Sequence, residues 1–487
     1  MSTDNHSSAK TCKLVHMLMY AFGECATSLV LNGINGFLML YYTKALGLNP
    51  KWAGIAISVS IFWEAVSEPV MGHISDNTRS RFGRRHAYIL IGGLLMAGFF
   101  YLIWGVPQVF LGSNLVLFSY LVVMNLLLRT GITVFFIPYM ALGFEMCGDY
   151  QGRSKIQSLR FIFSMIANIA GPAMAWKIFF NDAHGVQATT VPGNYVLMGG
   201  VFAVVTAVVV LLVTVITYRW HEDTRAVVSK LTGGRAVRNF IADMKQIILD
   251  PNPRWVFIFT FIVCVGMVLV STLQMYVYDD FMRFSADQKF IAHGSTMLGA
   301  GIGSAVAIFL SRLFDKKGTV IFGSAISIVG NLMLCILFLT GLLPKDAVWS
   351  VGGFVLPIAL ILFVVFHAAY WLGNGMLLPI ATAMMADAAE IHQIQTGENK
   401  DGGYSSVFSL AMRMAIAFSA IVSGFCLDWI GYKVPDSGKA VFQSPHTLWW
   451  LGAITFVVGT LIAIAALLAI RNYRIDRRFI EELRSAK

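Results

Sequence analysis

The sequence predicts an all-α membrane protein in which twelve transmembrane helices form two pseudo-symmetric bundles of six. Three observations predict this fold: an apolar composition, the number of long apolar stretches, and a partial repeat between the two halves of the chain. Of the 487 residues, 57% are hydrophobic and only 13% are charged, and the mean hydropathy is +0.70. Soluble domains are roughly 45–50% apolar and about 25% charged.

The apolar stretches give the number of helices. A membrane-spanning helix needs about 20 predominantly apolar residues. Twelve stretches meet this requirement, near residues 15–43, 52–74, 87–107, 114–143, 157–180, 195–218, 254–279, 289–313, 320–343, 350–384, 404–430 and 447–471.

The basic residues predict the orientation, because lysine and arginine are enriched in cytoplasmic loops. They gather in both terminal tails and in the loops after the second, fourth, sixth and eighth spans, while the intervening loops have few. Both termini and the long middle loop are therefore expected in the cytoplasm. The net charge of +10 is explained by these loops, so binding to nucleic acid is not expected.

The middle loop divides the chain into two units of six spans. The predicted units are residues 1–218 and 253–471, joined by a cytoplasmic loop at 219–252 and followed by a cytoplasmic tail at 472–487. MGHISDNTRSRFGRR follows the second span and FLSRLFDKKG follows the eighth, so the halves share a basic loop. This is the layout of major facilitator transporters, which hold substrate near the membrane midplane between their halves.

Two carboxylates lie inside the second span. Glu64 and Glu68 are four residues apart, so they share one helix face. Two such carboxylates repel each other when both are ionised, unless a cation or an arginine lies between them. The spacing therefore predicts a proton or sodium site. The alternative is that each acid is held in a fixed salt bridge with Arg129 or Arg160.

Other polar residues inside the spans are candidates for the same site or for substrate. The Thr133 hydroxyl either assists the glutamates or bonds the backbone of its own helix. Each arginine is either a counter-ion for a glutamate or a planar fork that grips hydroxyls and carboxylates. Aromatic and amide side chains suit a sugar site, although most such residues pack between helices. The candidate substrate-binding residues are Glu24, Arg129, Tyr139, Arg160, Gln274, Tyr276, Trp371, Asn374 and Arg413.

The basic loop after the second span predicts a different role, which is to tie helix ends together on the cytoplasmic face. Its candidate gating residues are Asp76, Arg79, Gly83, Arg84 and Arg85. The chain shows no nucleotide-phosphate loop, no hydrolase constellation and no CxxC pair among its six cysteines. The sequence therefore predicts a protein that is not an enzyme and that needs no cofactor or metal centre.

Four segments resemble a known family, the glycoside–pentoside–hexuronide:cation symporters that include melibiose permease. SEPVMGHISDNTRSRFGRR resembles its span 2–3 motif and FFIPYMALGFEMCGDYQGRSKIQSLR its span 4–5 motif. YYTKALGL and GGYSSVFSLAMRM resemble the segments after span 1 and in span 11. The resemblance covers most of the chain.

The resemblance implies roles for individual residues. The family's two cation-binding acids fall on Glu64 and Glu68, its assisting threonine on Thr133, its sugar-contacting arginine on Arg160 and its span 11 lysine on Arg413. The third acid of the family falls on Phe136 and is missing. Its galactoside-type Lys–Asp pair falls on Glu24 and Cys25, and a tryptophan falls on Met140, so a galactoside substrate is not expected.

We therefore expect a monomeric symporter that couples cation entry to uptake of a sugar or glycoside by alternating access. Proton coupling is favoured over sodium because the cage has fewer oxygens. An acidic sugar such as a hexuronide is a candidate because of the arginines, alongside neutral glycosides. The family points to a bacterial inner or plasma membrane. The rival hypotheses are a lipid or lysophospholipid carrier of the same fold and a membrane receptor without transport.

Overall fold

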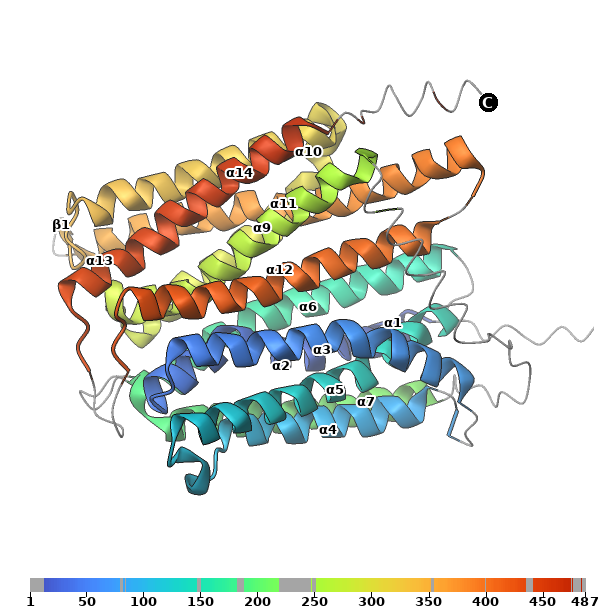
Figure 1. Cartoon of the computed structure of the whole chain (residues 1–487), viewed down its shortest axis with the longest axis horizontal. Helices are drawn as coiled ribbons and strands as arrows, with labels where there is room; N and C mark the ends of the chain where they lie inside the picture. The colour runs from blue at the N-terminus through green and yellow to red at the C-terminus, as the bar shows by residue number, and fades with distance from the viewer. Residues whose placement is uncertain are drawn as a thin grey trace, which may run out of the picture.

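The computed structural model describes residues 13–78, 82–83, 85–146, 150–181, 188–218, 247, 251–351, 354–398, 400–434, 441–473, 475 and 483. These residues form long helices that lie side by side, with one small hairpin (Figure 1). The predicted middle loop and C-terminal tail fall almost wholly outside this part of the chain.

The helices of the N-terminal half run back and forth through the bundle. The first path is broken into four pieces, α1 (Leu14–Phe22), α2 (Glu24–Gly33) and the π-helical turns η1 (Ile34–Leu38) and η2 (Tyr41–Ala45). The other helices are α3 (Pro50–Asn77), α4 (His86–Trp104), α5 (Asn114–Met146), α6 (Tyr150–Ile178) and α7 (Pro192–Thr217), with short turns η3 (Gln108–Leu111) and η4 (Ala188–Thr190).

The C-terminal half has the same order. It contains α9 (Pro251–Tyr276), η6 (Val277–Phe281), α10 (Ala286–Leu334), η7 (Cys335–Leu339), α11 (Ile358–Thr396), α12 (Asp401–Trp429), α13 (Pro445–Ala453), η8 (Ile454–Val458) and α14 (Gly459–Arg471). We call the end of the bundle that carries η2, η6 and the hairpin the distal end. The beginning of α1 and the end of α14 lie at the other end (Figure 1).

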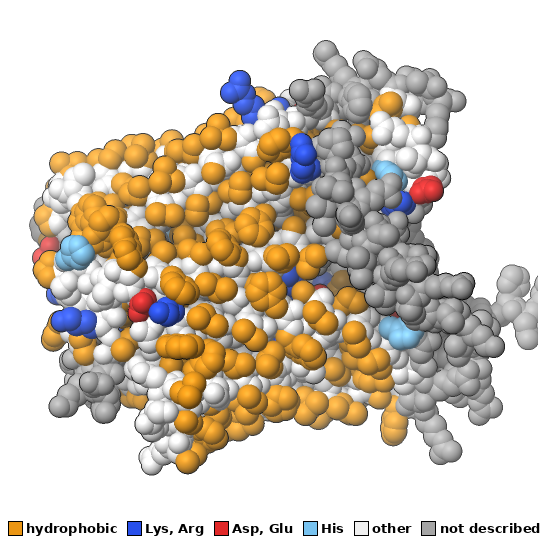
Figure 2. All heavy atoms as spheres, viewed as in Figure 1, with side chains coloured by type: hydrophobic (Ala, Val, Ile, Leu, Met, Phe, Trp, Pro, Cys, Tyr) orange, Lys and Arg blue, Asp and Glu red, His pale blue; other side chains and the backbone are white. Residues whose placement is uncertain are grey.

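Eleven helical segments of the described chain are long and apolar enough to cross a membrane. One of them, Ala286–Leu339, has 54 residues and contains two of the predicted spans. Hydrophobic side chains cover most of the flank of the bundle between its two ends (Figure 2). Such a surface suits a lipid environment, because soluble proteins rarely expose large contiguous apolar patches.

The long segment reverses direction at one residue. Asp315 has φ 58° and ψ 174°, far from helical values. From Gly299 to Gly303, the α11 residues that they contact have increasing residue numbers. From Gly323 to Gly330, the α11 residues that they contact have decreasing residue numbers. The segments before and after Asp315 are therefore antiparallel, and the described part of the chain contains the twelve spans that the sequence predicts.

The predicted tenth span begins too early. Here β1 (Trp349–Val351) pairs antiparallel with β2 (Phe354–Leu356), so the described residues from 350 to 356 form strands rather than the expected helix. In the register of this pairing, Trp349 lies opposite Leu356 and Val351 opposite Phe354. α11 begins after Pro357, whose ring fixes φ and suits the start of a helix.

The two halves touch where α3 packs along α12 and α6 packs along α10. Toward the distal end, α3 and α12 approach closely through glycines. A Cβ atom on Gly54 would lie 2.5 Å from the carbonyl oxygen of Ala420, and one on Gly424 would collide with the carbonyl of Pro50. Small residues allow helix backbones to approach in this way within membranes.

This contact predicts the effect of one methyl group. Gly424→Ala should push α12 away from α3 and cost about 1–3 kcal/mol, as overpacking does. We expect a lower unfolding temperature in detergent. The matched control is Gly98→Ala on α4, where a Cβ meets nothing within 4 Å and no loss is expected. Equal unfolding temperatures for the two variants would rule out a tight contact at Gly424.

Candidate functional site

Two carboxylates of α3 meet two arginines where the halves touch. The guanidinium of Arg413, on α12, forms an ion pair through Nη1 with Glu64 Oε1 at 2.8 Å and donates through Nη2 to Glu68 Oε1. Arg129 Nη1, on α5, donates to Glu64 Oε2 at 2.5 Å. Glu64 and Arg129 are both buried. We call these four residues the Glu–Arg cluster; its two negative and two positive charges balance.

The cluster places an arginine between the two carboxylates. Arg413 belongs to the C-terminal half, whereas both acids belong to the N-terminal half, so their ion pairs join the two halves. Of the two arginines considered as fixed partners of these acids, Arg129 pairs with Glu64. Arg160 pairs with Glu24 instead.

The Thr133 hydroxyl lies next to the cluster. Its Oγ1 is 3.2 Å from the Oγ of Ser67, and the Ser67 hydroxyl also donates to the backbone carbonyl of Glu64 at 3.2 Å. Thr133 therefore reaches across from α5 to the turn of α3 that carries both glutamates. Its contact with α3 passes through Ser67, a residue that the sequence interpretation did not single out.

Arg160 and Glu24 form a second pair inside the N-terminal half. Arg160 donates to Glu24 Oε2 through Nε at 2.8 Å and through Nη2 at 2.5 Å, and its Nη1 bonds Gln157. Its guanidinium also lies 5.1 Å from the ring centroid of Tyr139. Tyr139 is fully buried, stacks on Tyr20, and donates its hydroxyl to the Tyr20 carbonyl. In this conformation Tyr139 therefore packs the helices together.

The candidate residues of the C-terminal half fall into separate groups. Gln274 Oε1 accepts hydrogen bonds from Trp371 Nε1 at 3.0 Å and lies 3.0 Å from His367 Nε2. The Nε2 of Gln274 is buried without a partner among the described residues. Asn374 bonds Ser327 and the carbonyl of the preceding turn, so it joins α10 to α11.

A small cavity lies between the halves. It has a volume of about 130 Å³ and is lined by residues of η1, α3, α5, α9 and α12, among them Asn35, Arg129, Ser271 and Thr272. Arg129 Nε is buried and has no hydrogen-bond partner in the described part of the chain. Ligand pockets usually measure about 300–1,000 Å³, so this cavity is smaller than a typical ligand pocket.

A larger cavity borders the Glu–Arg cluster on its other side. It measures about 480 Å³, lies between α3, α5 and α12, and is lined by Glu68, Arg413, Ser406 and Ser409 among others. The side chains of Glu68 and Arg413 are 20% and 23% exposed, whereas that of Glu64 is 4% exposed. Glu68 is therefore the carboxylate of the cluster that water reaches more readily.

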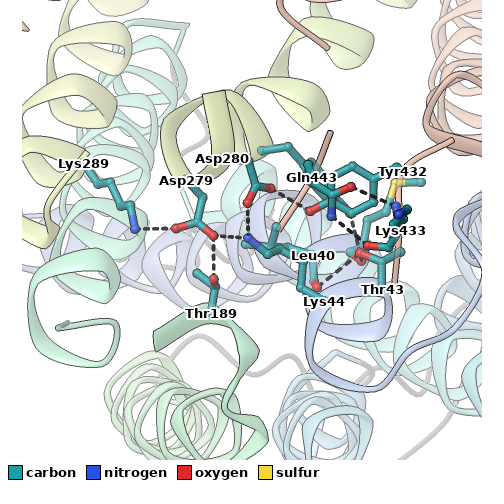
Figure 3. Close-up of polar contacts among 12 residues, drawn as sticks. Leu40, Thr43, Lys44, Thr189, Asp279, Asp280, Lys289, Tyr432, Lys433 and Gln443 are labelled. Atoms are coloured by element: carbon teal, nitrogen blue, oxygen red, sulfur yellow. Dashed lines mark hydrogen bonds and ion pairs between the residues drawn. The ribbon is translucent and has the colours of Figure 1, made fainter. Parts of the chain in front are cut away.

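The sequence interpretation missed a buried group of charges at the distal end, which we call the distal charge cluster. Lys44 bonds both Asp279 and Asp280, the latter at 2.8 Å. Asp279 also accepts hydrogen bonds from Lys289 and Thr189, each at 2.5 Å. Figure 3 shows these side chains converging from η2, η4, η6 and α10.

The distal charge cluster joins the two halves. Lys44 and Thr189 belong to the N-terminal half, and the two aspartates and Lys289 to the C-terminal half. Tyr432 donates to Asp280 Oδ2 at 2.6 Å. Beside the cluster, the Tyr276 hydroxyl, a candidate for sugar stacking, lies 2.7 Å from Thr43 Oγ1. Tyr276 therefore also bridges the halves.

The repeat between the halves explains this cluster. η2 and η6 are both π-helical turns that end the first path of their half. Leu46 N bonds Tyr41 O just as Met282 N bonds Val277 O. In this register Lys44 is equivalent to Asp280. Both charged segments lie at predicted span ends, where charges are common, so only an alignment of YYTKA with VYDDF would have revealed them.

The basic loop ties helix ends within one half. Arg85 pairs with Asp76 at 2.6 Å and with Glu145 at 3.0 Å, and donates to Ser75 at 2.7 Å. Gly83 has φ 79°, a left-handed conformation that favours glycine. Two further predicted gating residues, Arg79 and Arg84, lie outside the described residues.

Comparison with known proteins identifies the family. The model of the family described as MFS/sugar transport protein matches residues 19–477. The chain belongs to this family. The match agrees with the resemblance to glycoside–pentoside–hexuronide:cation symporters, and it confirms a membrane transporter with the major facilitator fold rather than an enzyme.

Individual relatives are distant, and some of them align with almost the whole chain. An uncharacterized symporter of Bacillus subtilis (strain 168), YnaJ, is 22% identical over 96% of this chain and 93% of its own length. An isoprimeverose transporter of Lactiplantibacillus pentosus is 22% identical over 95% and 90%. A sodium-dependent lysophosphatidylcholine symporter of Gallus gallus is 25% identical, over only 33% of this chain and 30% of its own length.

Solved structures share the fold at low sequence identity. A bacterial homolog of the human lysosomal transporter Spinster, solved in an inward-facing and unoccupied conformation, has a TM-score of 0.64 and 10% identity. The match covers 94% of this chain and 97% of that one. At this identity the likeness supports the fold alone.

Within the described residues, no group of three or more His, Cys, Asp or Glu side chains is arranged to hold a metal ion.

The distal charge cluster predicts a strong effect of one substitution. Lys44→Met leaves two buried aspartates with one lysine, and breaking such a buried pair costs about 3–5 kcal/mol. We expect a clearly lower unfolding temperature in detergent. The double variant Lys44→Met/Asp280→Asn, which balances the charges again, should recover part of the loss.

The matched control for this prediction is Lys177→Met. Lys177 pairs with Asp287, but both side chains are more than half exposed, so a loss of at most about 1 kcal/mol is expected. If Lys44→Met unfolds at the same temperature as this control, the ion pairs of Lys44 do not stabilise the protein.

Proposed function

We propose that the protein is a symporter that couples cation entry to sugar or glycoside uptake by alternating access, with the Glu–Arg cluster as its coupling site. The observation that carries the proposal is the position of Arg413. Its guanidinium is held by Glu64 and Glu68 across the contact between the halves. A cation that neutralises these acids would release Arg413 and thereby loosen the halves.

The positions of the cavities and ion pairs support an occluded state. Along α3, Ile57 and Ile61 of the central cavity precede Glu64; along α9, Ser271 and Thr272 precede Asp279. The central cavity therefore lies between the Glu–Arg cluster and the distal charge cluster. We propose that substrate binds there, and that the two clusters open in turn. The moving bodies would be residues 1–218 and 253–471.

A proton is the coupling ion that we favour. The charges around Glu64 and Glu68 are already balanced by Arg129 and Arg413, so the cluster offers few free oxygens for sodium, which binds oxygen ligands. A proton needs only one carboxylate oxygen. We propose that Glu68, which borders the larger cavity, accepts it, and that Thr133 and Ser67 hold the turn in place.

The substrate class follows from the central cavity. Arg129 lines it and keeps a buried Nε without a partner among the described residues. An unpartnered guanidinium N–H is a donor for a hydroxyl or a carboxylate, so we propose a sugar or glycoside and include acidic sugars. The family model, described as sugar transport, supports this class. Arg160, already engaged by Glu24, is a less direct candidate.

Two alternatives are separated by the same experiment. A lipid carrier is favoured by two partial relatives that are lysophosphatidylcholine symporters, and it should transport lysophospholipid but not sugars. A receptor without transport should move no cation with any ligand. The uptake assay in proteoliposomes, with a sugar panel, lysophosphatidylcholine, and imposed proton or sodium gradients, distinguishes all three functions.

The coupling role that we propose for Glu68 predicts the effect of a single substitution. In Glu68→Gln, gradient-driven accumulation should fall about tenfold or more, toward the equilibrium level, because the proton acceptor is gone. Exchange of labelled for unlabelled sugar at equal concentrations should persist, since it needs no cycle of cation release. Glu64→Gln should impair both activities, because it leaves the buried Arg129 short of its partner.

The control for this prediction is Glu398→Gln. Glu398 is an exposed acid that pairs with Lys400 at 3.3 Å, and its loss should leave accumulation unchanged. If Glu68→Gln accumulates sugar as the wild type does under both proton and sodium gradients, Glu68 is not part of the coupling site.

The second prediction concerns acidic substrates. Arg129→Gln should raise the KM for a hexuronide about tenfold or more, because a charge-assisted hydrogen bond is lost, and should change the KM for a neutral glycoside much less. Arg129→Lys keeps the charge but loses the planar fork, so its KM for the hexuronide should lie between those of the wild type and Arg129→Gln. Equal effects on both substrates would show that Arg129 only supports Glu64.

A further inference from the structure

A cavity of about 570 Å³ hollows the distal end of the C-terminal half. It lies among the turn after η6, the loop before the hairpin, the beginning of α11, and α13. Its polar lining consists of Arg283, Gln288, Lys345 and Asp346. The volume falls within the range of about 300–1,000 Å³ that small-molecule sites occupy. No part of the Glu–Arg cluster or the distal charge cluster lines it.

Arg283 holds a backbone conformation that arginine avoids. Its φ is 54°, and side chains with a Cβ atom are strained in this left-handed region. The equivalent position in the N-terminal half, by the register of η2 and η6, is Gly47 with φ 76°. Both turns end in a polar residue, Asn49 or Ser285, that caps the next helix. The turn therefore accommodates glycine, and this half carries arginine there despite the strain.

Lys345 brings a second cation into the same cavity. Its ammonium lies 3.4 Å from the ring centroid of Phe281, a cation–π contact. Burial, and secondly the charge of Arg283, lower the pKa of Lys345 to about 8. Within the described residues, neither cation has a carboxylate within 4 Å, and Asp346 lies beyond that distance. The lining therefore carries a net positive charge without an ion-pair partner.

We propose that this cavity binds an anionic group, a carboxylate or a phosphate, between Arg283 and Lys345. Arginine can hold such a group with two parallel hydrogen bonds, and lysine adds a point charge. The left-handed backbone of Arg283 places this residue in the lining of the cavity. The anion is either a soluble ion or the phosphate of an anionic lipid headgroup. The inference does not depend on the proposed function.

The test measures binding of radiolabelled inorganic phosphate to the full chain in nanodiscs of phosphatidylcholine. We expect saturable binding to the wild type, and binding about tenfold or more weaker in Arg283→Gly and in Lys345→Gln, since each loses one charged partner. Arg283→Gly also relieves the backbone strain, so its unfolding temperature should not fall. This separates loss of binding from loss of folding.

The matched control is Lys51→Gln. Lys51 is another cation at the distal end, 5.5 Å from the ring centroid of Phe425, and its loss should leave phosphate binding unchanged. A wild type that binds no phosphate in phosphatidylcholine overturns the proposal. Binding that is equally strong in Arg283→Gly and Lys345→Gln overturns it as well.

A second arm identifies the source of the anion. In nanodiscs that contain phosphatidylglycerol, a site for lipid headgroups should lose phosphate binding, because the lipid competes for the same two cations. A site for soluble anions should keep it, and unlabelled glucuronate should then displace the phosphate. Either result supports an anion site, provided that both substitutions weaken the binding.

Discussion

Arg413 lies across the contact between the two halves and is held by two carboxylates of the opposite half. Within a membrane a charge must be partnered or hydrated, because the hydrocarbon offers neither. The halves can therefore separate at this level only if the carboxylates and the guanidinium find other partners. A coupling cation and incoming water are such partners. The same constraint applies to Lys44 at the distal end, so both charge clusters that join the halves can open only if their ions find other partners.

The Glu–Arg cluster and the distal charge cluster differ in how readily their ions can exchange partners. The distal charge cluster is almost completely buried, and each aspartate accepts at least two hydrogen bonds from lysine, threonine or tyrosine. The Glu–Arg cluster borders a cavity of about 480 Å³, and Glu68 is partly exposed. A small cation can reach the Glu–Arg cluster from this cavity. The distal charge cluster is enclosed, so it can open only if whole helices move. This difference is consistent with a Glu–Arg cluster that responds to the ion and a distal charge cluster that opens in response.

The sequence predicted the fold well, because length and hydropathy determine which segments can cross a membrane. It also singled out Glu64, Glu68, Arg129 and Arg413, because charges inside apolar spans need a reason. Tyr139 and Asn374 were harder to interpret, since an aromatic or amide side chain looks the same in sequence whether it packs or binds. Lys44, Asp279 and Asp280 were missed because they lie at span ends, where the same residues are usually exposed. The hairpin before α11 was missed because its residues are as apolar as a helix.

Asp315 connects two antiparallel spans with a single residue outside helical geometry. Lys316 N bonds the Asp315 side chain at 2.7 Å, and Lys316 Nζ bonds Asp387 of α11 at 2.5 Å. Lys317 bonds the backbone at the end of α14. The turn at Asp315 is therefore short, and it is bonded to both α11 and the end of α14. Four of the six spans of this half, the eighth, ninth, tenth and twelfth, are thus linked at one point. A displacement of the eighth span, which packs against α6 of the other half, would therefore carry the ninth, tenth and twelfth spans with it.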